Sequence, residues 1–409
     1  MKKRVDIVLE KQISKIKPDE KELEIIKNET DKIILEIETG LKKKKIKAEI
    51  FVGGSLAKGT LIRKKDYDID VFVRFFENKE ISEKLASVVK AERVHGSRDY
   101  FRIRKKNILF EIIPVLKIKK PEEAKNITDL SYFHVSYVLG ETRKNKKLSE
   151  EIMLAKSFCF SQKCYGAESY VRGFSGYALE LLVSHYKSFM NFIKAVAKEK
   201  TPIVIDPKKF YKNKEDVLNQ LNESKLQSLI VFVDPTFKQR NALAALSNET
   251  FEKFKKACAD FIKKSSEKFF EEKKINEKDF NLILEASTDR QEGDIAGAKL
   301  LKFSRFFLSK IEKYFKIKKS EFDYEGKKSG KMYIKDERKK EIIYPGPPIN
   351  KPERLLAFKQ AHKKVFIKKN ESYALEKSLS FREFFAKFLK DNKTVMKEMG
   401  IVKLKVIKS

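Results

Sequence analysis

The chain has 409 residues, of which 41% are hydrophobic, and it carries a formal net charge of +32. This length exceeds what one compact core holds and the hydrophobic content excludes a disordered protein, so we expect a globular chain of roughly two to four domains. No apolar run is long enough to span a bilayer, the three cysteines are typical of reduced thiols in a cytoplasmic protein, and the excess of Lys and Arg favours RNA or DNA as a partner over a membrane.

The first predicted elements are a helix, a strand and a glycine turn. Apolar residues keep a helical period over residues 18–40, and residues 47–52 read as a strand. The strand runs into Gly53 and Gly54, which are followed by Ser55. Glycines let a backbone approach a phosphate closely, and the N–H groups of such a turn can cradle it together with the serine hydroxyl.

The next predicted strand, residues 67–73, carries two acids. Asp68 and Asp70 are two positions apart, so their side chains project from the same face of the strand. Carboxylates crowded on one face repel each other, and divalent metal ions bound through oxygen ligands would remove that cost. The alternative is a simple turn followed by a half-buried strand with solvated aspartates. The Gly-Gly-Ser turn with the downstream Asp-x-Asp resembles the polymerase-beta-like nucleotidyltransferases, which transfer a nucleotide from a triphosphate to a hydroxyl group.

A third acid lies in a later strand. Residues 100–104 and 108–116 read as two strands joined by a turn, and Glu111 is the only charge in the apolar run at the start of the second. A buried carboxylate without a partner is costly. Either the strand bulges or faces water there, or strand pairing brings Glu111 beside Asp68 and Asp70 as a third ligand of a two-metal centre.

Blocks further along the chain sharpen the resemblance. A helix is predicted at residues 148–162 and another from about residue 170 to about residue 196. Five blocks are similar in type and spacing to the archaeal CCA-adding enzymes, the class I tRNA nucleotidyltransferases; they are Phe133-His134, Lys156, Tyr165-Gly-Ala-Glu168, Val171-Arg-Gly-Phe-Ser-Gly-Tyr177, and Val233-Asp-Pro235 with Arg240-Asn241.

The last part of the chain has no sharp motif. Residues 230–236 read as a strand that ends where a helix begins near Arg240, and residues 251–273 read as a long, lysine-rich helix. Short strands are predicted at 332–334, 342–344 and 364–367. Residues 344–348, Tyr-Pro-Gly-Pro-Pro, are typical of a rigid linker or turn.

The resemblance implies a multidomain protein of the α/β and α+β classes. Its parts would be a polymerase-beta-like nucleotidyltransferase head at residues 1–140, a mostly helical, nucleotide-binding neck at residues 141–250, and body and tail modules at residues 251–409 that bind tRNA. The oligomeric state is left open, with a homodimer among the options.

The resemblance also implies a reaction and its residues. An RNA 3′-hydroxyl would attack the α-phosphorus of CTP or ATP, with Mg²⁺ held by Asp68, Asp70 and Glu111, to build or repair the 3′-terminal CCA of tRNA. The positions that match the family's nucleotide contacts are Ser55, Lys58, His134, Lys156, Tyr165 and Arg240. The third metal-binding acid is usually Asp in this family, and here it is Glu.

Other readings remain for these residues and for the whole chain. Without the resemblance, Lys58 is as well explained as a solvated lysine, His134 as a structural histidine and Tyr165 as a core aromatic. The chain itself could be another polymerase-beta-like transferase, such as a poly(A) or oligoadenylate synthetase, or a non-catalytic RNA-binding relative.

Overall fold

The computed structural model describes residues 2–221 and 226–409, the side chains of residues 2 and 3 excepted. The chain forms two compact units, Met1–Lys273 and Lys274–Ser409, which mix helices and sheets as predicted. The predicted boundary at residue 250 falls inside helix α10 (Asn248–Lys263), and this helix belongs to the first unit. The functional boundaries at residues 140 and 250 therefore stay a prediction. No helix in the described part of the chain is both long and apolar enough to cross a membrane.

The first unit contains a five-stranded sheet with strand order β1-β2-β5-β4-β3. The strands are β1 (Ala48–Val52), β2 (Tyr67–Phe75), β3 (Glu92–Val94), β4 (Tyr100–Lys105) and β5 (Ile108–Leu116), and two short helices, α3 (Gly54–Ala57) and α4 (Ile81–Ala86), lie between them in sequence. β2 and β5 are parallel and the other neighbours antiparallel. The strands that carry the predicted acids therefore lie next to each other inside the sheet.

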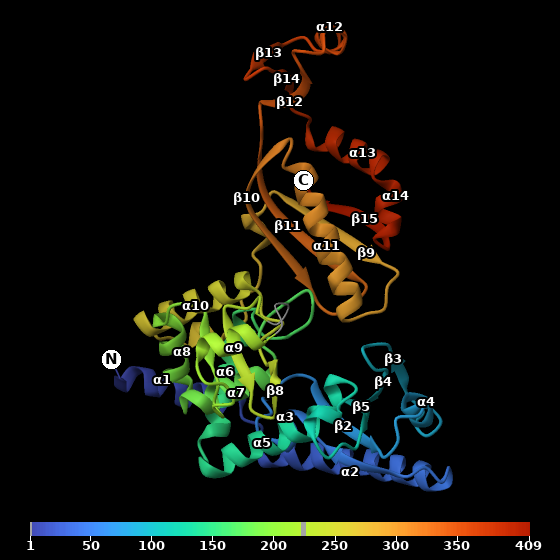
Figure 1. Ribbon diagram of the computed structural model, residues 1–409, viewed down its shortest axis with the longest axis vertical. Helices are drawn as coiled ribbons and strands as arrows, with labels where there is room; N and C mark the ends of the chain where they lie inside the picture. The colour runs from blue at the N-terminus through green and yellow to red at the C-terminus, as the bar shows by residue number, and fades with distance from the viewer. Residues whose placement is uncertain (1, 222–225) are drawn as a thin grey trace. The chain divides into compact units, whose positions relative to one another are not determined.

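Helix α2 (Glu20–Lys43) covers one face of this sheet (Figure 1). Asp19 caps its N-terminus in a capping box with Glu22. The buried residues of the helix lie in one cluster with those of β2; they are Ile26, Ile33 and Ile37 from the helix and Ile69, Val71 and Val73 from the strand. Because strand residues alternate between the two faces, Asp68 and Asp70 lie on the face opposite α2. The helix ends at Lys43, so the predicted end at residue 40 was too early.

The rest of the first unit is mainly helical. Its helices are α1 (Lys2–Ile16), α5 (Ser131–Lys144), α6 (Leu148–Ser161), α7 (Gly176–Tyr186), α8 (Phe189–Lys198), α9 (Lys214–Gln220) and α10. A small sheet of β6 (Ile203–Ile205), β7 (Ile230–Asp234) and β8 (Phe237–Asn241) completes it. The core contains many aromatic side chains, among them Phe158, Phe174, Phe189, Phe254 and Phe261. Helices α6 and α7 pack into this aromatic core. α6 carries Lys156 and α7 carries Tyr177, both from the blocks that resemble the family.

Two predictions for this region are wrong. The helix expected up to residue 196 breaks in two, because Lys187 has φ of +68° and Ser188 caps a new helix. The helix expected near Arg240 is the strand β8. Asp234 Oδ1 accepts the Thr236 N–H at 2.8 Å, which stabilises a turn that sends the chain back as a hairpin.

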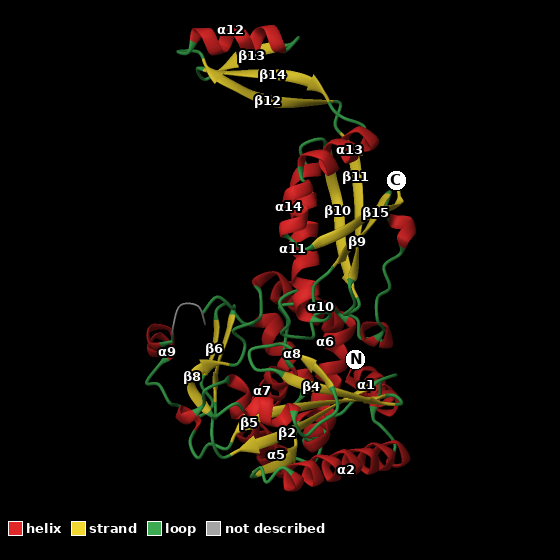
Figure 2. Cartoon of the chain, turned by 90° about the vertical axis from the view of Figure 1, so that its right-hand side faces the viewer, coloured by secondary structure: helices red, strands yellow, loops and turns green. Residues whose placement is uncertain are grey.

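The second unit combines two antiparallel sheets with four helices (Figure 2). One sheet has strand order β10-β11-β9-β15, from β9 (Leu282–Thr288), β10 (Phe315–Tyr324), β11 (Ser329–Arg338) and β15 (Ile401–Lys408); α11 (Asp294–Ile311), α13 (Phe381–Asp391) and α14 (Lys393–Glu398) contribute to its core. The other has order β12-β14-β13, from β12 (Glu341–Pro348), β13 (Val365–Lys368) and β14 (Glu371–Lys377), with α12 (Pro352–Ala361).

The proline-rich segment 344–348 is not the predicted linker or turn. It forms the second half of β12, with an irregular register between Pro345 and Pro348. Proline cannot donate a hydrogen bond to a neighbouring strand, so it is tolerated mainly on edge strands. β12 is such an edge strand.

Candidate active site

The glycine turn after β1 packs directly against Asp70. Gly54 has φ of +58°, in the left-handed region, and a Cβ there would overlap the Asp70 carboxylate. A Cβ on Gly53 would overlap the Phe72 ring, and the Gly53 N–H donates to the Asp70 carbonyl oxygen at 2.9 Å. Only glycine fits both positions. The turn that carries the partly exposed Ser55 is thus held beside the acid, as the sequence pattern predicted.

The three predicted metal-binding acids share the sheet face opposite α2. Asp70 on β2 stands in register with Glu111 on the parallel strand β5, so both side chains project from the same face. Burial raises the pKa of Asp70 to about 7; the Glu111 and Asp68 carboxylates add to the rise, while the Lys58 ammonium lowers it. The three acids therefore lie on one face of the sheet, and their charges repel; their role as metal ligands stays a prediction.

Glu111 has an arginine partner that the sequence analysis missed. Arg102 stands in register with Glu111 on β4, and its Nε and Nη2 donate to Glu111 Oε1 at 3.1 and 2.9 Å. Burial raises the pKa of Glu111, and the guanidinium opposes that rise. Within residues 2–221 and 226–409, no three His, Cys, Asp or Glu side chains are arranged as a ready metal site. The donors are on one face, but Glu111 is turned toward Arg102.

Lys58 and Lys156 meet at a buried carboxylate, Glu180 in α7. Lys58 Nζ donates to Glu180 Oε2 at 2.6 Å, and Lys156 Nζ donates to Glu180 Oε1 at 2.8 Å. Lys156 Nζ also donates to Thr60 Oγ1 at 2.8 Å, and that hydroxyl donates to Glu180 Oε1 at 3.1 Å. Both lysines lower the pKa of Asp70, so their positive charge lies close to the acidic face.

Tyr165 reaches the same cluster from the loop after α6. A Cβ on Gly176, the first residue of α7, would lie 3.0 Å from Tyr165 Oη and 3.9 Å from Lys156 Nζ. Burial, with the nearby Glu180 carboxylate, raises the pKa of Tyr165, so its hydroxyl stays protonated and can donate a hydrogen bond. The predicted residues Ser55, Lys58, Lys156 and Tyr165 are thus gathered around the acidic face and the cluster beside it.

His134 and Arg240 meet at a second buried carboxylate, Asp234, at the end of β7. Arg240 Nη1 donates to Asp234 Oδ2 at 2.6 Å, and His134 Nε2 lies 3.3 Å from the same oxygen. Tyr177 Oη donates to Asp234 Oδ1 at 3.0 Å, and its ring stacks on His134 with centroids 4.0 Å apart. Burial lowers the pKa of His134 although Asp234 opposes this. Burial alone would raise the pKa of Asp234, but these contacts hold it below its usual range.

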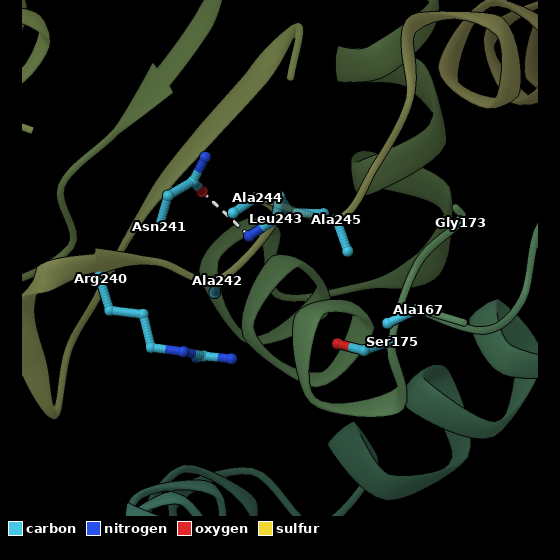
Figure 3. Close-up of a pocket in the computed structure, with 9 residues that line it drawn as sticks. All are labelled: Ala167, Gly173, Ser175, Arg240, Asn241, Ala242, Leu243, Ala244 and Ala245. Atoms are coloured by element: carbon cyan, nitrogen blue, oxygen red, sulfur yellow. Dashed lines mark hydrogen bonds between the residues drawn. The ribbon is translucent and has the colours of Figure 1, made fainter. Parts of the chain in front are cut away.

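A pocket of about 250 Å³ opens beside Arg240 (Figure 3). Figure 3 shows the side chains of Arg240 and Ser175 reaching toward it from opposite sides, and the Leu243 N–H donates to Asn241 Oδ1 at 2.9 Å in the loop after β8. Its lining is mostly small residues: Ala167, Gly173, Ser175, Arg240, Asn241, Ala242, Leu243, Ala244 and Ala245. An arginine, an amide and a hydroxyl around a small apolar surface are suited to a planar ligand with polar edges.

Known families match both parts of this site. The family model of the nucleotidyltransferase domain matches residues 34–134, and that of the second domain of tRNA nucleotidyltransferase matches residues 150–271. The CCA-adding enzyme of Nanoarchaeum equitans is 34% identical over 336 residues, which cover 79% of this chain and 82% of that protein. This chain belongs to the CCA-adding enzyme family. The CCA-adding enzyme of Methanocaldococcus jannaschii is 27% identical over 405 residues, which cover 90% of this chain and 87% of that enzyme.

Solved structures add a likeness of fold. One of a cytoplasmic RNA terminal U-transferase covers 67% of this chain and all of that chain, with a TM-score of 0.52 and 15% identity. One of Cid1 with its short product ApU covers 66% of this chain and 99% of that chain, with a TM-score of 0.51 and 13% identity. At such identities the likeness concerns the fold alone, and it agrees with the predicted polymerase-beta-like head.

Sequence reasoning missed the residues that hold the predicted ones in place. Glu180 and Asp234 are the buried carboxylates at which the predicted cations meet, and Arg102 pairs with Glu111. A signal was present for Glu180, because it is the only acid in the otherwise apolar stretch of α7. Asp234 lies within the Val233-Asp-Pro235 block, but the resemblance implied no role for it. The signal for Arg102 was the predicted hairpin itself, because strands at 100–104 and 108–116 joined by a short turn pair residue 102 with residue 111.

Proposed function

We propose that this member of the CCA-adding enzyme family adds C, C and A to the 3′ end of tRNA, from CTP and ATP and without a nucleic-acid template. The family membership carries the proposal, together with one observation: the acids of β2 and β5 stand on one sheet face, beside a glycine turn and two buried lysines. These are the groups that nucleotidyl transfer needs, since the reaction depends on positioning a triphosphate and neutralising its charge.

Enzymes with this fold use divalent metal ions, and we propose Mg²⁺ for this one. Asp68, Asp70 and Glu111 would hold it. Carboxylate oxygens are the donors that Mg²⁺ prefers. Burial and the neighbouring Glu111 carboxylate disfavour the ionised form of Asp70 and raise its pKa, and a bound cation would offset that cost. Glu111 would have to leave Arg102 to take part. When bound, such ions neutralise triphosphate charge and lower the pKa of the attacking 3′-hydroxyl.

The side chains around the acids bind and orient the nucleotide. Ser55 and the N–H groups of its turn lie where they can hold phosphate oxygens, and Lys58 and Lys156 supply two ammonium groups beside the acidic face. The Tyr165 hydroxyl, which stays protonated, would donate to the sugar or a phosphate.

Arg240 and the pocket beside it would receive the base. The hydrogen bond to Asp234 fixes the guanidinium, so that its remaining N–H groups can read polar atoms on a base edge. His134, stacked on Tyr177, lies against Asp234 next to Arg240.

The partner that we propose is tRNA, bound through distributed Lys and Arg side chains. The net charge of +32 supports a polyanionic partner. The three cysteines are free and buried, which supports the prediction of a cytoplasmic enzyme.

The test is primer extension on a tRNA that ends before CCA, with CTP alone, ATP alone and both. We expect two C residues with CTP alone and ordered C, C, A with both nucleotides. A tail of A residues alone would identify a poly(A)-type transferase instead. No incorporation at all, with tRNA still bound, would identify a non-catalytic RNA-binding relative.

A further inference from the structure

Glu180 links the two halves of the site. Its carboxylate receives Lys58 and Thr60 from the loop after α3, within the nucleotidyltransferase domain, and Lys156 from α6, within the second domain. The Glu180 side chain is 1% exposed, and those of Lys58 and Lys156 are 9% and 4% exposed. A single carboxylate thus fixes two buried ammonium groups that arrive from different parts of the chain.

The charges of this cluster do not balance. Two ammonium groups share one bonded carboxylate in a place where water is largely excluded, so the hydrogen-bonded cluster holds one more cation than anion, and Asp70 is a further acid within electrostatic reach. A lysine ammonium has three N–H groups, and the bond from Lys58 to Glu180 uses one of them. Lys156 Nζ donates to Glu180 Oε1, to Thr60 Oγ1 and, at 3.5 Å, to the Thr60 carbonyl oxygen, so Lys156 contributes its charge and Lys58 contributes N–H groups. Burial at the same time lowers the pKa of Lys156, and Glu180 opposes that change. The cluster is therefore suited to receive an anion, and Glu180 opposes the loss of charge from Lys156.

A purely structural ion pair would look different. One lysine would satisfy one buried carboxylate, and apolar side chains of similar volume commonly stabilise a fold as well as a buried pair does. Here the surplus positive charge lies within electrostatic reach of Asp70, and Tyr165 Oη and Lys156 Nζ both border Gly176. The cluster therefore adjoins the acidic face at which nucleotidyl transfer is proposed.

We propose that Glu180 is a positioning residue, which holds the ammonium group of Lys58 toward the triphosphate of the incoming nucleotide and keeps the charge of Lys156 beside it. This inference rests on the proposed function, since it concerns the same site. It assigns no bond-making step to Glu180, which would not touch the nucleotide. Its contribution is to the number and direction of the positive charges that meet the β- and γ-phosphates.

The test is Glu180→Gln in the full-length enzyme. The amide keeps the shape but not the charge, so the two lysines lose their common anchor. We expect the affinity for ATP without tRNA, measured by calorimetry, to fall about tenfold or more, and the KM for ATP and CTP to rise by a similar factor. We expect kcat to change less than about threefold, because the lost contacts bind substrate and transition state alike. Inhibition by AMP and the KM for tRNA should stay unchanged.

Further variants separate positioning from folding. Glu180→Asp keeps the charge with a shorter reach, and we expect an intermediate loss of ATP affinity. In a Lys58→Met background, Glu180→Gln should lower ATP affinity by a smaller factor than in the wild type, because Lys58, one of the two lysines bonded to Glu180, is already absent. Glu151→Gln is the matched control: Glu151 accepts the Phe189 N–H at 2.7 Å and is not the carboxylate to which Lys58 and Lys156 are bonded, so its loss should affect the thermal midpoint but not ATP affinity.

Three results would overturn the inference. One is an unchanged or tighter affinity of Glu180→Gln for ATP. Another is an equal loss of ATP, AMP and tRNA binding, which would indicate a general disruption. If Glu180→Gln does not fold, Thr60→Val replaces it, and ATP affinity within about twofold of the wild type would reject the inference. Because ATP binding is measured without tRNA, the outcome does not depend on whether the wild-type enzyme adds C, C and A.

Discussion

Asp70 contacts or interacts electrostatically with more of the candidate site residues than any other residue of the site. The glycine turn packs on its carboxylate, Glu111 stands beside it in register, and the lysines at Glu180 lower its pKa. A carboxylate with so many constraints cannot be moved to suit a ligand. It defines where a cation, and hence the triphosphate, has to be.

Asp70→Asn should remove nucleotide addition while leaving tRNA binding intact. The amide keeps the size of the side chain but is a far weaker ligand for a divalent cation. Mutation of a residue that hydrogen-bonds to a metal ligand commonly lowers metal affinity or activity by about 10-fold to 100-fold. Loss of a direct ligand should therefore lower kcat by at least about 100-fold. Single-turnover extension of tRNA and a filter-binding assay measure the two effects. Activity within tenfold of the wild type would rule out Asp70 as a ligand.

The raised pKa of Asp70 predicts a dependence of stability on pH. The carboxyl group has a pKa of about 7 in the folded protein against an ordinary value of 3.8, so the folded chain binds more protons than the unfolded chain between these values. Stability from this group is therefore present at low pH and is lost as the pH rises through about 7. Without divalent metal, Asp70→Asn should raise the thermal midpoint relative to the wild type more at pH 8 than at pH 5.

Adding Mg²⁺ should reverse this effect at pH 8. A cation at the acidic face stabilises the ionised form of Asp70, so the wild-type midpoint should rise with Mg²⁺ and that of Asp70→Asn should rise less. Differential scanning calorimetry with Mg²⁺ or with EDTA measures both. Equal effects of Mg²⁺ on the two proteins would place the metal elsewhere.

At the scale of elements, the site depends on a tight connection between β1 and β2. Gly54→Ala is the sharpest test, because the added Cβ would overlap the Asp70 carboxylate and would also have to adopt φ of +58°. We expect a loss of about 1–3 kcal/mol in the free energy of unfolding, measured in urea, and a large loss of nucleotide addition.

Gly140→Ala is the control for that substitution. Gly140 lies inside α5, and a Cβ there would meet nothing within 4 Å. Alanine in a helix interior is favoured over glycine, so this variant should be neutral or more stable by about 0.5–1 kcal/mol, with full activity. If both variants behave alike, the contact between Gly54 and Asp70 has no special role.

The sequence predicted elements well where local periodicity decides them and poorly where tertiary contacts do. The strands of the head and the shared face of Asp68 and Asp70 follow from alternation, and Glu111 followed from strand pairing. The hairpin β7–β8 was missed because its turn depends on the side chain of Asp234. That side chain is oriented by its contacts with His134 and Arg240. The bond from the Thr236 N–H to Asp234 is itself a local turn signal that the sequence reading did not use, whereas the contacts of Asp234 with His134 and Arg240 are tertiary.

At the scale of the whole molecule, the main feature is a large excess of positive charge. Lys and Arg number 91 against 59 Asp and Glu, and the excess is spread along the chain. The sequence predicted this electrostatic character outright, since net charge needs no fold. It could not predict which lysines are withdrawn from the surface, because the burial of Lys58 and Lys156 arises only when α6, α7 and the loop after α3 meet at Glu180.

The affinity for tRNA should therefore fall steeply with salt. A protein that neutralises several phosphates releases bound counterions, so the logarithm of the association constant falls linearly with the logarithm of the salt concentration. Between 50 and 200 mM KCl we expect a loss of about 100-fold or more. Asp70→Asn should give the same slope as the wild type, because the acidic face contributes no phosphate contacts of its own. A flat dependence on salt would mean that tRNA is held mainly by contacts other than Lys and Arg, and the excess positive charge would then need a different explanation.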